Sequence, residues 1–597
     1  MEKNLYSNLK TILSRYRYRF FKAFVMVLAS NCLLILNPLI FRQAVMEMDL
    51  HVEKPVGIIA SGIHNLLGSH SQQLVFWVLL LLCISLTSSI FKYFMRVTFI
   101  SVSRDAEKDV RSKLFAKIQE QSMAFYDRHG IGELLSRLTN DISAYRDVLG
   151  PGIMYPLFFL TLVIPGLFAL YSISPILTAI SIIPLFAIPL LNMAIRRKVY
   201  DISHLVQGGL ADLSNMSQEH YSGERIIKGY AAEPQMIHSF SELCRSLITL
   251  NIKLNCYQGL LYPFFTMLTK IITIILVIFS GAIILLAWGT LNVADFISFM
   301  WIQSYIFFPI LMMAWVLPLY ERGRAAYDRL WEIYQEPIDI KEGKFPKATI
   351  PPLADIEFRN LTFNYPTASL AVLNDFSLTI KGGTFTGITG AVGAGKTTLF
   401  RLLNREYEIS EDKIFINGRD IHDYPLSAFN ESMVTVEQIP FLFSRTIAEN
   451  VSFGKEDASM EEIEFVSKFA DLHENILEFP QQYETVIGER GITLSGGQKQ
   501  RLAMARAFLV DRSILLLDDV FSAIDASTEK RIFATMQANF KNKTVLLITH
   551  RVSVLNQTDR IIYMSEGKIV EDGTPQDLLE LKGHYAALAE LQRLHSS

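Results

Sequence analysis

The chain has little charge for its length. Only 19% of its 597 residues are Asp, Glu, Lys or Arg, whereas 50% are hydrophobic. This composition is apolar for a soluble protein. The formal net charge of −3 gives no basic excess, so we expect no nucleic-acid partner. The length exceeds that of one ordinary domain and predicts at least two.

Cysteine is also scarce. The four cysteines are Cys32, Cys83, Cys244 and Cys256. No pair of them has the spacing of a metal site, and three lie in or beside apolar runs. We therefore expect free thiols, either buried or facing lipid.

Long apolar runs are concentrated in the first half of the chain. About 20 apolar residues suffice to cross a bilayer. We predict six spans, at residues 24–41, 74–91, 154–171, 176–195, 257–288 and 296–319. No small-residue cleavage site follows residue 41, so the first span is not expected to be a removable signal peptide.

Lys and Arg are unevenly distributed between the loops. They are frequent before the first span, after the second and after the fourth, whereas residues 172–175 and 289–295 contain none. Positively charged loops stay in the cytoplasm. We therefore predict a multi-pass protein of the cell (inner) membrane with both termini in the cytoplasm.

The basic segments show helical apolar spacing, so spans two to five are expected to continue as helices below the membrane. We predict two tips farthest from the bilayer, a turn at residues 125–135 and a matching one at 205–213 around Gly208 and Gly209. The prolines and charges of residues 336–352 indicate a linker. The predicted domains are thus 1–335 in the membrane and 353–597 in the cytoplasm.

The second domain contains a Gly-x-x-x-x-Gly-Lys-Thr pattern. It comprises Gly390, Ala391, Val392, Gly393, Ala394, Gly395, Lys396 and Thr397, followed by Thr398. A predicted buried strand precedes the pattern and a predicted helix follows it, which is the context of a phosphate-binding loop. Backbone N–H groups would surround phosphate, Lys396 would reach the terminal phosphates, and the Thr397 hydroxyl would ligate Mg²⁺. The alternative is a glycine-rich turn before an ordinary helix.

Further polar residues follow predicted strands or begin a helix. Gln438 ends a short β-type run and is a candidate for contact with Mg²⁺ or the attacking water. Asp518 and Asp519 end an apolar strand, where Asp518 would hold Mg²⁺ and Asp519 would act as general base. His550 ends another strand and could touch the terminal phosphate. Tyr365 could stack on adenine, although a strand aromatic is more often part of the core.

A second anion site is predicted at Ser495, Gly496, Gly497 and Gln498, which precede a strong helix former. One nucleotide in one chain does not need two such sites. The simplest explanation is that this segment completes a nucleotide site on another chain.

Taken together, these motifs resemble the nucleotide-binding domain of ATP-binding-cassette (ABC) proteins. The phosphate loop, the glutamine, the Leu-Ser-Gly-Gly-Gln signature, the Asp-terminated strand and the switch histidine occur in the family's order. Six spans fused ahead of the cassette resemble an exporter half-transporter, most like one subunit of a bacterial heterodimeric multidrug-type exporter. The resemblance implies an α-helical six-span domain, an α/β phosphate-loop ATPase with a helical subdomain, ATP and Mg²⁺ as ligands, and a second half-transporter.

One residue departs from the family pattern. The family usually has Glu after the Mg²⁺-binding Asp, whereas this chain has Asp519. Losing one methylene shortens the reach by ~1.5 Å, and a general base must reach its water. We therefore expect Asp519 to be a poor catalyst in a degenerate site, while the intact signature serves a competent site in the partner.

The leading hypothesis is ATP-driven efflux of a hydrophobic or amphipathic substrate. A homodimeric lipid or peptide exporter and a channel-like or regulatory ABC protein are the alternatives. The spans argue against a soluble ABC ATPase, and the fusion of both domains argues against an importer. Candidate cavity residues are Asn31, Asn37, Lys270, Trp301, Gln303 and Tyr305. Lys270 is either functional or extends to the inner interface.

Overall fold

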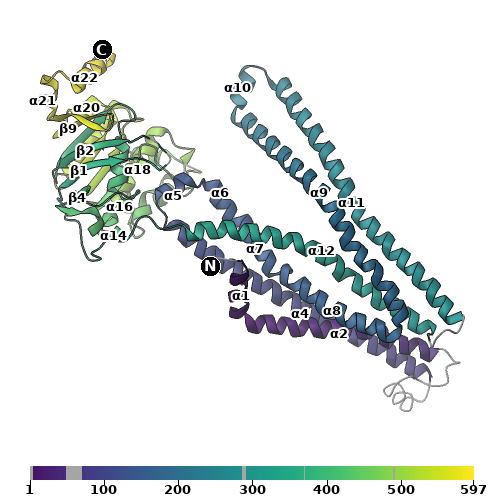
Figure 1. Cartoon of the computed structure of the whole chain (residues 1–597). Helices are drawn as coiled ribbons and strands as arrows, with labels where there is room; N and C mark the ends of the chain where they lie inside the picture. The colour runs from purple at the N-terminus through teal and green to yellow at the C-terminus, as the bar shows by residue number, and fades with distance from the viewer. Residues whose placement is uncertain are drawn as a thin grey trace. The chain divides into compact units, whose positions relative to one another are not determined.

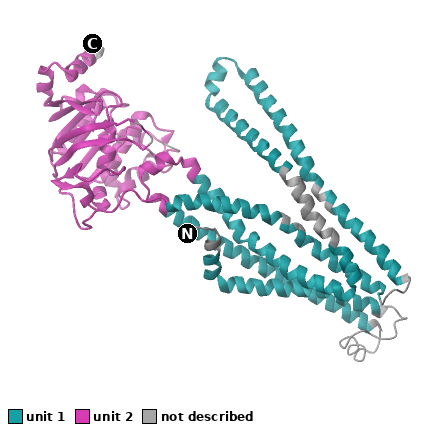
Figure 2. Cartoon of the chain, viewed as in Figure 1, with its two compact units in different colours: residues 1–116, 135–335 teal, residues 117–134, 336–597 magenta. Residues whose placement is uncertain are grey.

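The computed structural model describes residues 5–48, 70–285, 291–366, 368, 370–488 and 491–596, with no side-chain surroundings for 5–9, 47–48, 70–71, 183–197, 261–262, 265, 285, 311, 314 and 595–596. Residues 49–69 of the predicted first outer loop, and residues 286–290 before the sixth span, lie outside the described residues. The chain forms two compact units, residues 1–116 with 135–335 and residues 117–134 with 336–597 (Figure 2).

The first unit consists of long helices (Figure 1). They are α1 (Leu5–Arg15), α2 (Arg17–Met48), α4 (His70–Gln119), α8 (Pro151–Ile173), α9 (Pro175–Ser222), α11 (Glu233–Leu285) and α12 (Val293–Gln335), with the shorter α7 (Ile142–Leu149) and α10 (Glu224–Gly229) and a π-helical turn at Arg137–Asp141. Helix α6 (Ile131–Ser136) begins in the second unit and ends in the first. Among the described residues, five segments are long and apolar enough to cross a membrane. They fall in α2, α4, α8, α11 and α12; the predicted fourth span falls in α9, where side chains are not described.

Helices α2, α8 and α12 share one apolar core. Phe158 and Leu162 of α8 and Phe299 and Ile302 of α12 are buried in it. Burying an aliphatic or aromatic side chain removes its apolar surface from contact with the surrounding solvent or lipid and gains close packing. Below this core, Arg329 of α12 donates to Asp141 at 2.9 Å and 2.5 Å.

Helices α9 and α11 run side by side and are joined at α10 (Figure 1). The predicted tip around Gly208 and Gly209 is wrong, because both residues lie inside α9. A Cβ on Gly209 would stand 2.8 Å from the Leu247 side chain of α11. Gly209 thus lets two helices approach closely and does not turn the chain. The turn lies at Gly223, which caps α9, and at Ala231, where φ is +50°.

The second unit contains two sheets. The four-stranded sheet has the order β2-β1-β4-β5 and the six-stranded sheet the order β10-β9-β3-β8-β7-β6. The strands are β1 (Ile356–Phe363), β2 (Leu373–Ile380), β3 (Phe385–Gly390), β4 (Ile414–Ile416), β5 (Arg419–Asp420), β6 (Met433–Val436), β7 (Ile514–Asp518), β8 (Thr544–Ile548), β9 (Arg560–Ser565) and β10 (Lys568–Gly573). Strands β6, β7, β8, β3 and β9 are parallel. Their carboxyl ends therefore meet at one edge of the sheet, where α/β proteins bind ligands.

Helices cover the sheets and form a subdomain. They are α13 (Lys396–Leu403), α14 (Leu426–Ser432), α15 (Ile447–Val451), α16 (Met460–Phe469), α17 (His473–Leu477), α18 (Gly496–Leu509), α19 (Ala526–Asn539), α20 (Val552–Leu555), α21 (Pro575–Glu580) and α22 (His584–Ser596). One apolar core joins α15, α16 and α18 to β7, with Leu502 and Leu517 fully buried. The predicted helical subdomain is thus built directly onto β7.

The first predicted tip, residues 125–135, interrupts the helices only at His129 and Gly130, and its residues up to 134 belong to the second unit. Its short helix α5 (Met123–Arg128) follows the end of α4. Tyr407 donates to the Asp127 carboxylate at 2.6 Å, and Met123 N–H donates to the Glu406 carbonyl at 3.1 Å. This tip therefore packs on other residues of the second unit.

Candidate functional site

The phosphate loop joins β3 to α13. Gly390 has φ +139° and Gly395 has φ +92°, values that favour glycine. A Cβ on Gly390 would lie 1.9 Å from the Met564 carbonyl oxygen, whereas one on Gly393 would meet nothing within 4 Å. Gly390 is therefore required by packing and conformation together. Gly393 has φ +80°, so glycine is required there by conformation alone.

Lys396 is buried at the first turn of α13. Its Nζ donates to the carbonyls of Gly390 at 2.9 Å and Ala391 at 2.7 Å. Burial lowers the pKa of its ammonium, and Asp518 and Asp519 oppose that shift. The opposite side of the loop is open, with Val392 95% exposed. The cation thus lies under a loop whose outer backbone is accessible.

Asp518 and Asp519 end β7 beside this loop. Asp518 is 6% exposed. Burial raises the pKa of its carboxyl, while a hydrogen bond from Thr397 lowers it. Asp519 has φ +46°, and its N–H donates to the Ile548 carbonyl at 2.8 Å. The structure therefore brings together the two Asp residues and the Thr397 that the sequence predicts.

Gln438 and His550 lie at the same edge. Gln438 Nε2 donates to Asp519 Oδ2 at 3.2 Å. Burial raises the pKa of Asp519, and the nearby His550 and Gln438 oppose the shift. Burial and Lys396 lower the pKa of His550. The lowered pKa favours the neutral imidazole of His550, and an imidazole, an amide and a carboxyl group at one edge are suitable for orienting a water and a phosphate.

The donor set fits Mg²⁺. This ion prefers hard oxygen ligands and is usually bound by one or two carboxylates plus substrate phosphates. Asp518, Thr397 and Gln438 offer a carboxylate, a hydroxyl and an amide oxygen at one edge. Among the described residues no cluster of three His, Cys, Asp or Glu could hold a metal alone. Bound Mg²⁺ would neutralise phosphate charge here.

The signature residues begin α18. The Ser495 hydroxyl accepts from Gln498 N–H at 3.3 Å, and Gln498 Oε1 accepts from Ser495 N–H at 2.9 Å. This capping box satisfies two N-terminal donors. A Cβ on Gly497 would lie 2.7 Å from the Ala523 carbonyl oxygen, so the signature packs on the loop after Asp519. In the described part of the chain, no hydrogen bond or ion pair joins these residues to the phosphate loop.

Tyr365 lies beside the phosphate loop. Its hydroxyl is 3.0 Å from Thr398 Oγ1, and its ring packs edge-on against Phe363 and Tyr407, with centroids at 5.2 Å in both pairs. The side chain is half-buried. The aromatic contacts and partial burial agree with a core role, and the place beside the phosphate loop agrees with a contact to the adenine.

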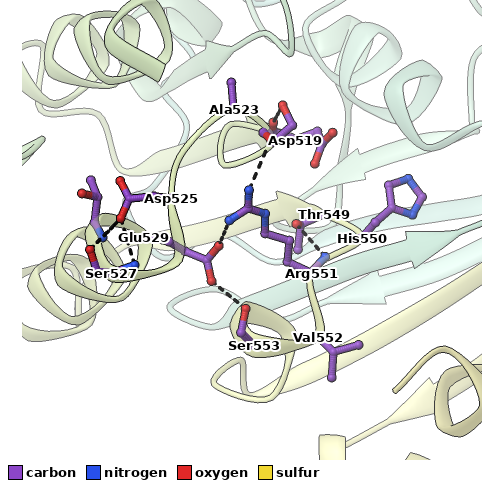
Figure 3. A network of polar contacts seen from close by, with 12 residues as sticks. Asp519, Ala523, Asp525, Ser527, Glu529, Thr549, His550, Arg551, Val552 and Ser553 are labelled. Atoms are coloured by element: carbon purple, nitrogen blue, oxygen red, sulfur yellow. Dashed lines mark hydrogen bonds and ion pairs between the residues drawn. The ribbon is translucent and has the colours of Figure 1, made fainter. Parts of the chain in front are cut away.

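Sequence reasoning missed the side chains that link these loops. Gln500 donates to Ser522 Oγ at 2.7 Å and accepts from Ala523 N–H at 3.0 Å. A pocket of about 630 Å³ lies against Gln438, Gln500 and Ala523. Arg551 pairs with Glu529 near the same loop (Figure 3). Gln500 falls two residues after the signature, but nothing in its spacing indicates this contact.

Comparison with known proteins agrees with this geometry. Residues 20–310 match the ABC transporter transmembrane region, and residues 373–522 match the ABC transporter family. A solved bacterial Atm1-family ABC exporter with ATP bound shares the fold, with a TM-score of 0.75, 24% identity, and coverage of 97% of this chain and 98% of that one.

The chain is similar to curated proteins along most of its length. The multidrug resistance-like ATP-binding protein MdlA of Escherichia coli is 30% identical over 92% of each chain. The probable multidrug resistance ABC transporter YheI of Bacillus subtilis is 31% identical over 98% of this chain and 96% of its own length. An ATP-dependent lipid A-core flippase of Desulfotalea psychrophila is 30% identical over 86% of this chain and 89% of its own length. This chain therefore belongs to the ABC transporter family, as an ATP-hydrolysing membrane protein that joins one exporter-type transmembrane domain to one nucleotide-binding domain.

Proposed function

We propose that this chain is one half of a heterodimeric exporter that uses ATP to expel a hydrophobic or amphipathic compound, and that it carries the slower of two nucleotide sites. The observation that carries this proposal is Asp519, held by Gln438 at the end of β7 while the signature at Ser495 is intact. A homodimer that exports a lipid or peptide is the second candidate.

Two features support a partner chain. The signature residues make their hydrogen bonds within their own helix start, so their free N–H groups suit a nucleotide held by another chain. The tip α10 of the α9–α11 hairpin has no buried residue, and the flanking Tyr221 and Tyr230 are 82% and 83% exposed. Large exposed aromatics are typical of protein interfaces.

The residues suggest how each site would work. Lys396 and the loop backbone would bind phosphates, and Asp518 and Thr397 would hold Mg²⁺. Asp519 would accept a proton from the attacking water, with Gln438 orienting that water and His550 contacting the terminal phosphate. Closure of two cassettes around ATP would move the inner-loop tips, and thereby the spans.

The substrate class rests on the membrane half. Asn31 is buried and donates to Thr161 Oγ1 at 2.8 Å, and Asn37 donates to Ser85 Oγ at 3.1 Å. Trp301 stacks edge-on with Phe41, with centroids at 5.3 Å. Such an aromatic interior with few polar groups suits amphipathic compounds. Lys270 is exposed near the start of the apolar segment Thr266–Ile284, which favours extension to the inner interface.

The orientation follows from charge. With both termini in the cytoplasm, the cassette faces cytoplasmic ATP, and the multi-pass protein lies in the cell (inner) membrane. The names of the relatives refer to multidrug resistance and to lipid flipping, and an exporter of amphipathic compounds agrees with both.

Transport in inside-out vesicles tests the proposal. Ethidium and a fluorescent short-chain lipid serve as probes, and Lys396→Ala as the matched inactive variant. We expect ATP to drive at least one probe against its gradient in the parent protein only. Equilibration without accumulation would indicate a channel-like protein. No movement of either probe, with ATPase intact, would contradict the substrate class.

A further inference from the structure

One side chain beside the switch histidine has no part in the mechanism above. Gln592 lies on the C-terminal helix α22 and is half-buried. Its Nε2 donates to the His550 carbonyl at 2.5 Å, and its Oε1 accepts from Val552 N–H at 3.0 Å. A single carboxamide therefore bridges the backbone on both sides of residue 551.

The residues that follow His550 are held from a different side. The Glu529 carboxylate, 1% exposed on α19, pairs with Arg551 and accepts from Ser553 Oγ at 2.6 Å. Arg551 Nη2 also donates to the Ser522 carbonyl at 3.2 Å. Figure 3 shows the Arg551 side chain turned toward Glu529, while the His550 ring points the other way. These contacts fix residues 551 and 553 but do not involve His550.

The backbone before His550 is fixed by the sheet. Thr549 N–H donates to the Ile388 carbonyl of β3 at 3.1 Å. The Gln592 bond fixes the peptide plane on the other side, at the carbonyl of His550. The backbone of His550 is therefore held from two sides, by β3 before it and by α22 after it. Loss of the Gln592 bond leaves the residue that carries the imidazole anchored from one side only.

We propose that Gln592 is a positioning residue for His550, and that the C-terminal helix thereby sets how strongly this chain's own nucleotide site prefers ATP over ADP. The inference rests on the proposed contact between His550 and the terminal phosphate. ADP lacks that phosphate. A displaced imidazole therefore weakens ATP binding and leaves ADP binding unchanged.

Photolabelling of the purified transporter with azido-ATP in the cold tests this inference. Electrophoresis separates the chains, so the label on this chain reports its own site whether or not that site hydrolyses ATP. Unlabelled ATP or ADP is added as a competitor for the site. The concentrations of ATP and of ADP that halve the label on this chain give its preference for ATP. A hydrogen bond to a charged group corresponds to more than about a tenfold change in binding, so His550→Ala should lower the preference for ATP more than about tenfold. Gln592→Met should lower it two- to fivefold, and the double variant should match His550→Ala alone.

Two further variants separate positioning from folding. Gln592→Glu keeps the acceptor for Val552 N–H but loses the donor to His550, so it should reduce the preference as Gln592→Met does. Gln537 is a matched control, a half-buried glutamine on α19 that donates to the Gln557 carbonyl at 2.7 Å. Gln537→Met should leave the preference unchanged.

The outcomes are distinguishable. Gln592 variants that retain the full preference for ATP would overturn the inference. So would variants that weaken ATP and ADP equally, or whose effect adds to that of His550→Ala. An unaltered preference in His550→Ala would instead overturn the proposed role of His550, and the inference with it.

Discussion

Gln438 and Asp519, from the ends of the neighbouring parallel strands β6 and β7, are joined by a hydrogen bond of 3.2 Å. The bond holds the shorter carboxylate against the glutamine that is proposed to position the attacking water. A glutamate would extend ~1.5 Å further. The geometry thus supports a base with short reach, in a site whose other groups are complete.

Lys396→Ala should abolish ATP-dependent transport. The variant removes the cation that balances charge on the terminal phosphates, so this chain's own site no longer holds ATP and the two cassettes cannot close around both nucleotides. Lys381→Ala is the control, because Lys381 is an exposed lysine paired with Asp355 at 2.7 Å. Transport by both variants in inside-out vesicles provides the measurement. Retained transport in Lys396→Ala, with expression unchanged, would contradict the assignment of the phosphate loop.

Tyr365 should act mainly in binding. Base stacking contributes about 1–3 kcal/mol, so Tyr365→Ala should weaken ATP binding to this chain's own site about tenfold. Tyr365→Phe loses the 3.0 Å contact with Thr398 but keeps the ring, and its ATP binding should stay within about twofold. Competition by ATP against azido-ATP photolabelling of this chain, measured for both variants, decides whether Tyr365 is a ligand or a core residue. Equal, small effects would make Tyr365 a core aromatic.

Two glycines of the phosphate loop should differ in their tolerance of alanine. Gly390→Ala adds a clash with the Met564 carbonyl to a positive φ, so it should destabilise the cassette strongly. Gly393→Ala meets no neighbour and should cost about 1–2 kcal/mol from conformation alone. The Tm values of the Gly390→Ala and Gly393→Ala variants, measured by thermal unfolding, are compared. A Gly393 variant with the lower Tm would contradict this geometry of the loop.

The contact between α5 and the cassette should matter for coupling. Burial and the hydrogen bond to Asp127 raise the pKa of Tyr407, which keeps the hydroxyl protonated as a donor. A bond to a charged group contributes about 1.5–3 kcal/mol, so Asp127→Ala should lower transport per ATP hydrolysed several-fold. Tyr407→Phe should do the same, without an additive effect in the double variant. Glu411→Ala, which breaks the exposed pair with Lys344, should leave the ratio intact, and an equal loss there would contradict coupling through α5.

Much of the nucleotide site could be predicted from the sequence because its residues follow short apolar strands. The edge of the sheet where Gly390, Gln438, Asp518 and His550 meet is determined by parallel pairing, and the strands were recognisable from their composition. The ABC exporter family was also predictable, since its motifs are specific and ordered.

The remaining features depend on contacts between distant parts of the chain. Gly208 and Gly209 suggested a turn, but Gly209 serves close packing against α11. The Gln592 bridge to His550 spans 42 residues, and no local pattern indicates it. The docking of Asp127 on Tyr407 spans 280 residues. Such pairings follow from tertiary packing and not from periodicity.

The division of labour between two nucleotide sites is the central claim, and the ATPase rates of two variants test it. Asp519→Asn changes only the charge, because Asn tolerates the positive φ of this position. Ser495→Arg places a bulky cation at the start of α18 and removes its cap. Ser459 is the matched control, since it caps α16 with the same reciprocal bonds to Glu462, and Ser459→Arg should cost only about 1 kcal/mol of stability.

The most direct measurement is the ATPase rate of Asp519→Asn against Ser495→Arg, in the transporter purified with its partner half. We expect Asp519→Asn to retain most of the parent rate and Ser459→Arg nearly all of it. Ser495→Arg should lose most of the rate, because it disrupts the faster site in the partner. Equal loss in Asp519→Asn and Ser495→Arg would contradict the asymmetric transporter and indicate a homodimer with Asp519 as its base.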